Sequence, residues 1–137
     1  MTNWPLGAWH EAVARHLRLH LATQRPVELS RGARQAIDNP ANELGLSHVS
    51  IWEVHLKHFA GKLSLPSPPR FWFSQQMAVW GVQDQAVDLE SLHRTSELPP
   101  VHRDPFDRLL VAQALVHGLV LVSPDEYFPK YGLNLIW

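Results

Sequence analysis

The chain has 137 residues, 45% hydrophobic and 18% charged, which is a globular composition and a one-domain length. The absence of cysteine excludes disulfides and thiolate metal sites and fits a cytoplasmic protein. A net charge of −1 gives no support to general coating of nucleic acid. No apolar run approaches the roughly 20 residues that cross a bilayer, and the start lacks the pattern of a signal peptide. We therefore expect one cytoplasmic domain over residues 1–137, with no membrane segment.

The first third of the chain predicts two helices. Apolar residues recur at helical spacing in the segment 9–23, which predicts the first helix: Val13, Leu17 and Leu21. The second predicted helix covers about 31–37. It ends before Asn39 and Pro40, because the residue before a proline avoids the helical conformation.

The middle of the chain predicts a strand followed by two helices. The strand is expected at 42–46, and Ser47 is expected to cap a helix that Gly61 terminates. The Pro68-Pro69 pair suits the opening of the next helix, and Gly81 is expected to close it.

Two more helices are predicted before the end of the chain. Asp88 is expected to cap a short helix that runs through Leu92 and ends before Pro99. In the longer one Asp104 is the N-cap, Pro105 the first helical residue, and Gly118 the C-terminal stop.

Two apolar segments, 119–123 and 133–137, predict strands after the last helix. Helices that alternate with short apolar strands are typical of a small parallel α/β sheet.

Three acidic residues could have purely structural roles. Asp104 can accept the free N–H groups at the helix start, and Asp107, three residues later, resembles the acidic member of a capping box. Asp125 follows Ser-Pro and suits an ordinary turn. Capping and turn formation would account for all three without any ligand.

A functional interpretation depends on where the strands end. Glu53 follows the strand at 42–46, Asp125 follows the strand at 119–123, and Asp107 lies in the first turn of the helix between them. Ligands gather at the carboxyl ends of parallel strands, and carboxylates there suit a hard cation such as Mg²⁺ or Mn²⁺. Such a cation can activate water and stabilise phosphoryl displacement, which predicts phosphodiester hydrolysis.

Three segments carry a family resemblance: LSRGARQAIDNPANEL, SHVSIWEVHLKHFAGKLSLP and ELPPVHRDPFDRLLVAQALVHGLVLVSPDEYFPKYGLNLIW. Over residues 29–137, about four-fifths of the chain, it resembles PIN-domain proteins of the VapC-type toxin group. The resemblance implies a PIN-like α/β/α sandwich around a small parallel sheet. It also implies a metal-dependent endoribonuclease toxin that uses Mg²⁺ or Mn²⁺, commonly dimerises, and is inactivated by a cognate antitoxin protein.

The resemblance implies roles for individual residues. Glu53, Asp107 and Asp125 match the catalytic and metal-binding acids of the family, and Asp104 joins them as a further metal ligand. Ser123 matches an auxiliary hydroxyl. Arg108 in the D-P-F-D-R signature is expected to pair with a nearby acid or phosphate.

The first 28 residues depart from the family. The family opens with a strand that ends in an L-D-T-H-type motif, whose aspartate binds metal, but the first aspartate of this chain is Asp38. The segment 1–28 instead predicts a helix in place of that strand. This departure favours an alternative function, namely a catalytically impaired PIN fold that only binds antitoxin or another protein.

Histidines and aromatic residues suggest two further sites. His16 and His20, or His55 and His58, are spaced to share a metal on a helix, but no matching third ligand is evident, and exposed surface histidines are the favoured interpretation. An aromatic band in the segment 71–80 exceeds what one core face needs. Any exposed part of that band would suit a dimer or antitoxin interface.

Overall fold

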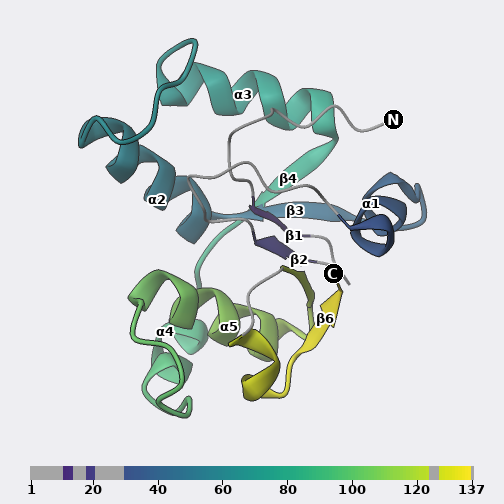
Figure 1. Ribbon diagram of the computed structural model, residues 1–137, viewed down its shortest axis with the longest axis vertical. Helices are drawn as coiled ribbons and strands as arrows, with labels where there is room; N and C mark the ends of the chain where they lie inside the picture. Colours follow the sequence, from purple (N-terminus) through teal and green to yellow (C-terminus); the bar gives the residue numbers. More distant parts are fainter. Residues whose placement is uncertain (1–10, 14–17, 21–29, 124–126, 137) are drawn as a thin grey trace.

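Helices and short strands alternate along the chain in the computed structural model, which describes residues 11–13, 18–20, 30–123 and 127–136 (Figure 1). The elements run in the order β1 (Glu11–Val13), β2 (Arg18–His20), α1 (Arg31–Asp38), β3 (Leu44–Ser47), α2 (His48–Phe59), α3 (Pro69–Trp80), β4 (Val82–Gln85), α4 (Leu89–Thr95), α5 (Pro105–His117), β5 (Val120–Val122), the 3-10 helix η1 (Phe128–Tyr131) and β6 (Asn134–Ile136). In the described part of the chain, no helix is both long and apolar enough to span a membrane.

The described strands form two small sheets with mostly parallel neighbours. One has the order β1-β2-β5-β6, in which β2, β5 and β6 are parallel and β1 is antiparallel to β2. The other pairs β3 with β4 in parallel. Figure 1 shows β1 and β2 between β3 and the β5-β6 pair, with α2 and α3 above the strands and α4 and α5 below them. This confirms the predicted α/β class and parallel pairing.

The predicted helix over 9–23 is wrong where the structure describes it. Residues 11–13 and 18–20 are strands, so a helix does not replace the N-terminal strand there. The rest of that predicted helix lies outside the described residues. The physical reason is sheet pairing. The apolar strand β5 would have an open edge without β2, and buried backbone groups need hydrogen-bond partners.

The predicted helix ends are confirmed after residue 30. The side chains of Ser47, Asp88 and Asp104 cap α2, α4 and α5, and Gly81 and Gly118 end α3 and α5 in the left-handed conformation. The predicted strand at 42–46 is shifted and becomes Leu44–Ser47. The helix predicted through Leu92 continues to Thr95.

Two elements were missed by the sequence prediction. β4 is the segment VQDQ, in which Val82 is the one apolar residue and the one buried residue. Its sequence therefore shows no alternation of apolar and polar residues that would predict a strand. It forms because its backbone pairs with β3. η1 is a single turn that contains Pro129, and its burial of Phe128 and Tyr131 is a tertiary effect.

The buried apolar residues form two main clusters. The upper cluster joins α1, β3, α2, α3 and β4: Ala33, Ile37, Leu46, Val54, Trp72, Phe73 and Val82. The lower one joins α5, β5, η1 and the loop after α4: Leu98, Val111, Ala112, Leu121, Phe128 and Tyr131. Each cluster alone is a small core, so the contacts that connect them matter for stability.

Helices α2 and α5 connect the two clusters. The hydroxyl of Ser47 donates to Gln113 Oε1 at 2.6 Å, and Gln113 Nε2 donates to the carbonyl of Ala86 at 3.0 Å. Further along α2, the ring of Trp52 lies 5.1 Å from that of Phe106 at the start of α5. The start of α2 therefore meets the later turns of α5, and the two helices run in opposite directions.

We expect Gln113→Leu to destabilise the fold. The side chain of Gln113 is fully buried, and its removal leaves the hydroxyl of Ser47 and the carbonyl of Ala86 without this partner. The free energy of unfolding should fall by about 1–3 kcal/mol in urea denaturation. The control is Gln75→Leu, the same change at an exposed position of α3. Equal losses in both variants would contradict the assigned role of this hydrogen bond.

Candidate functional site

Glu53 is an almost buried carboxylate in the second turn of α2. Its side chain is 13% exposed, and Lys57, one turn later, places its ammonium 2.9 Å from Oε1. The other oxygen, Oε2, is removed from solvent. Because α2 begins where β3 ends, Glu53 lies beyond the carboxyl end of that strand.

Asp107 is the second almost buried carboxylate, in the first turn of α5. Its Oδ2 lies 3.3 Å from Nε2 of His102, and the two side chains are 10% and 17% exposed. The imidazole of His102 packs against the rings of Tyr127 and Phe128, and its backbone N–H donates to the hydroxyl of Tyr131 at 2.7 Å. Asp107 therefore faces an aromatic wall built by the segment that follows β5.

Glu53 and Asp107 lie on α2 and α5, the two helices that pack together through the rings of Trp52 and Phe106. Each acid directly follows one member of that ring pair in the sequence. Among the described contacts each acid has its own partner, Lys57 for Glu53 and His102 for Asp107.

The other predicted site residues differ in how firmly they are placed. Asp104 is exposed, and its carboxylate accepts a hydrogen bond from the N–H of Phe106 at 2.8 Å, so it is the N-cap of α5. Ser123 is buried at the end of β5, and its N–H donates to the carbonyl of Ile136. Asp125 lies outside the described residues, two positions before Tyr127.

Strand β2, which pairs with β5, contains no aspartate. The register aligns Leu19 of β2 with Val122, so β2 ends with His20 at the carboxyl edge of the sheet. In the antiparallel pair, Glu11 is the register partner of His20. The backbone therefore places a histidine where the family resemblance implies an aspartate.

Arg108 donates to backbone carbonyls rather than to an acid among the described residues. One guanidinium nitrogen, Nη1, donates to the carbonyl of Pro99 at 2.9 Å, and Nη2 donates to that of Thr95 at 2.6 Å. Longer bonds reach the carbonyls of Leu98 and His102. Arg108 is a structural residue that fastens the end of α4 and the following loop to α5.

The paired histidines of α2, His55 and His58, make separate contacts with the protein. The ring of His55 stacks on Phe73, and Nδ1 of His58 lies 3.2 Å from the carbonyl of Leu63. His16 lies outside the described residues, as does the side chain of His20.

The aromatic band of α3 divides between core and surface. Trp72 and Phe73 are buried, whereas Phe71 is 61% exposed. An exposed apolar stripe also runs along α2: Trp52, Leu56 and Phe59.

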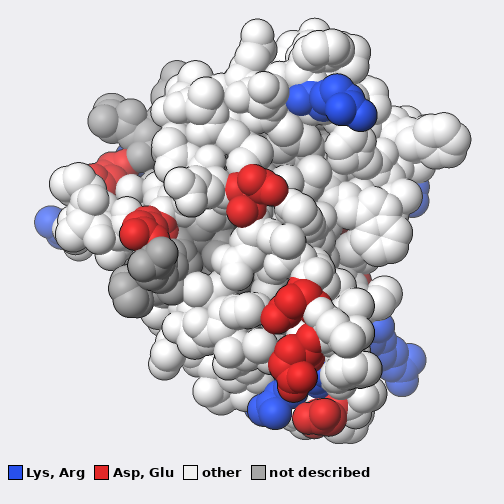
Figure 2. Space-filling view, turned by 180° about the vertical axis from the view of Figure 1, so that it is seen from behind, with Lys and Arg blue, Asp and Glu red and all other residues white. Residues whose placement is uncertain are grey.

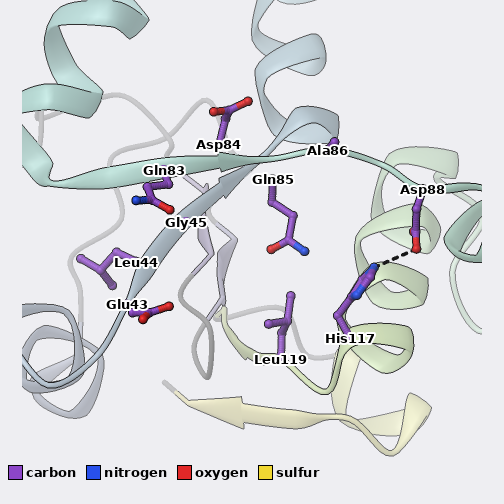
Figure 3. Close-up of a pocket in the computed structure, with 10 residues that line it drawn as sticks. All are labelled: Glu43, Leu44, Gly45, Gln83, Asp84, Gln85, Ala86, Asp88, His117 and Leu119. Atoms are coloured by element: carbon purple, nitrogen blue, oxygen red, sulfur yellow. Dashed lines mark ion pairs between the residues drawn. The ribbon is translucent and has the colours of Figure 1, made fainter.

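A cavity of about 480 Å³ lies at the opposite edge of the strands, beside the starts of β3 and β5 (Figure 3). Asp88 on its wall points toward His117, with 3.0 Å between Oδ2 and Nε2. Asp84 points away from Gln85, and the hydrogen bond to His48 lowers the pKa of Asp84. Two of its acids, Asp84 and Asp88, therefore pair with separate histidines, His48 and His117.

The donor chemistry of the carboxyl edge fits a hard divalent cation, because Glu53 and Asp107 offer oxygen ligands there. Among the residues that the structure describes, no three acids or histidines are close enough to hold a metal together. Asp125, the third predicted acid, is outside that set. Comparison with protein-family models finds no match, and comparison with curated proteins finds none.

Sequence reasoning missed the partners of both acids, Lys57 and His102. The contact of Lys57 with Glu53 could have been predicted, because the two residues are four positions apart on a predicted helix, where opposite charges lie side by side. The contact of His102 with Asp107 could not be predicted from sequence spacing. That contact depends on a loop that curls back over η1.

We expect Arg108→Lys to destabilise the protein although it keeps the charge. Lysine cannot reproduce the planar fork that donates to several carbonyls at once. The loss should be about 1–3 kcal/mol in urea denaturation. Arg94→Lys is the matched control, because Arg94 is exposed and pairs only loosely with Glu97 at 3.6 Å. No difference between the two variants would contradict this role for Arg108.

Asp88 should make stability depend on pH in the acid range. Hydrogen bonds from Ser91 and, less strongly, from His117 lower the pKa of Asp88 from 3.8 to about 2. A lowered pKa in the folded state contributes stability above the unfolded value, and this is lost as pH falls from about 4 to about 2. Asp88→Asn should reduce that decline in urea midpoints. Glu90→Gln, in the same helical turn, is the control, and an unchanged decline in Asp88→Asn would contradict the prediction.

Proposed function

We propose that this chain is a PIN-type, metal-dependent endoribonuclease toxin of a toxin–antitoxin pair. The observation that carries the proposal is the pair of nearly buried carboxylates, Glu53 and Asp107, on the two helices that pack together beyond the carboxyl ends of the strands. The ordered motifs of residues 29–137 support the same assignment. The PIN-like α/β/α sandwich is the finer description of the α/β fold under this proposal.

The proposal assigns the metal to Glu53, Asp107 and Asp125, with Asp104 at the rim and Ser123 as an auxiliary hydroxyl. Bound Mg²⁺ or Mn²⁺ would supply a more acidic water and neutralise charge on a phosphodiester. The chain's own residues orient the carboxylates. Packing of the His102 ring on Tyr127 and Phe128 restricts His102, which in turn positions Asp107.

Electrostatics limit how RNA can be held. The net charge is −1, and Asp and Glu side chains are spread over the middle and lower part of the face in Figure 2, with Lys and Arg toward its margins. A general basic surface is therefore not visible on that face. RNA binding would depend on local groups near the acids.

The remaining attributes of the proposal come from the family resemblance. They are a cytoplasmic location, a homodimer and a cognate antitoxin as protein partner. The exposed stripe of Trp52, Leu56 and Phe59 supplies apolar surface of the kind that protein interfaces use.

One observation favours a second candidate function. His20, not an aspartate, ends the strand beside β5, and Lys57 and His102 already lie against the two acids. These features favour a catalytically impaired PIN fold that only binds antitoxin or another protein.

Asp107→Asn should abolish metal-dependent RNA cleavage, lowering the rate by at least about a hundredfold, because it removes a charged ligand from a site that needs tight geometry. Cleavage of labelled RNA with Mg²⁺ or Mn²⁺ measures the effect. The control is Asp84→Asn, since Asp84 is an exposed acid on β4 that pairs with His48.

Equal cleavage by wild type and Asp107→Asn would refute the proposed site. Calorimetric titration with Mn²⁺ separates the two candidate functions. The impaired fold predicts no binding in the millimolar range, or binding without RNA turnover.

A further inference from the structure

A cleft of about 450 Å³ lies between the end of α4 and the start of α5. It is lined by two arginines, two hydroxyl residues and apolar side chains, with no acid among them: Arg103, Arg108, Thr95, Ser96, Leu92, Pro105 and Leu109. The composition suits an anion that carries an apolar group, as a nucleotide does.

The positive charge of Arg108 can still attract an anionic ligand. Its hydrogen bonds with the described residues go to neutral carbonyls, including those of Thr95 and Pro99. Those bonds fix the guanidinium but do not neutralise it. The wall of the cleft therefore carries a rigid positive charge.

Arg103 supplies a second and more accessible positive charge. Its side chain is exposed, and it makes no ion pair or hydrogen bond with any residue that the structure describes. The neighbouring acids are occupied by other groups, because Asp104 caps α5 and Asp107 faces His102. Arg103 is thus free to bind an anion that enters the cleft.

We infer that this cleft binds a backbone phosphate of the RNA strand, next to the phosphate presented to Glu53 and Asp107, with Arg103 as its ligand. The inference rests on the proposed function for the choice of RNA over an acidic peptide. The cleft and Asp107 share the first turn of α5, so one strand can reach both. Leu92, which is 48% exposed, offers apolar surface to the attached ribose or base.

The test is fluorescence anisotropy of a labelled single-stranded RNA of mixed sequence, with EDTA present so that no cleavage occurs. Arg103→Glu should weaken binding by about fivefold or more, and the slope of log affinity against log salt should shrink by about 0.7 for the lost phosphate contact. Arg103→Lys should bind nearly as wild type, because the charge is kept. Arg70→Glu, at an exposed site in the first turn of α3, is the matched control and should have no effect.

Equal RNA binding by wild type and Arg103→Glu, or a loss of the same size in Arg70→Glu, would overturn the inference, as would absence of RNA binding by wild type. Cleavage assays keep this result separate from the proposed function. If the protein cleaves RNA and Arg103→Glu changes neither binding nor cleavage, the proposed nuclease function stands and the proposed phosphate site in the cleft is refuted. If the protein does not cleave RNA but Arg103→Glu alone weakens RNA binding, the phosphate site is supported and the nuclease function is refuted.

Discussion

The packing of α2 against α5 is the constraint on which the rest of the structure depends. The buried apolar residues form an upper and a lower cluster, and the buried bond between Ser47 and Gln113 is a polar link between the helices that carry them. The same bond fixes the position of α2 along the axis of α5. That position also sets how Glu53 on α2 lies relative to Asp107 on α5, so the stability of the fold and the geometry of the candidate site depend on the same contact.

A nearly buried carboxylate needs a partner among the surrounding groups. Here the chain provides one for each acid, because the ammonium of Lys57 lies against Glu53 and the imidazole of His102 lies against Asp107. A divalent cation would have to compete with both. The ammonium of Lys57 sits on a flexible stem and can move away readily, whereas His102 is held by aromatic packing on two rings. A metal ion would therefore displace the partner of Asp107 less readily than the partner of Glu53.

Much of the fold from residue 30 onward could be predicted, because the residues at the helix ends determine where each helix begins and stops. A cap such as Asp104 followed by Pro105, and a stop such as Gly118, need no tertiary information. The strand β4 could not be predicted, since its polar sequence forms a strand only beside β3. The helix predicted over 9–23 failed for a related reason, because pairing with β5 outweighed helical spacing. Of the site, the acids could be named in advance, but the loop that brings His102 to Asp107 could not.

Neighbouring residues of α5 take opposite roles because successive side chains on a helix point about 100° apart. Asp107 faces His102 and the aromatic wall, while Arg108 turns to the carbonyls at the end of α4. The D-P-F-D-R signature thus joins a carboxylate to a structural cation rather than to a catalytic one. It follows that the cation able to exchange ligands is Arg103, which precedes the helix and has no structural duty. The start of α5 therefore has the carboxylate of Asp107 on one side and the guanidinium of Arg103 on the other. A phosphodiester strand could interact with both, through a metal ion at Asp107 and directly at Arg103.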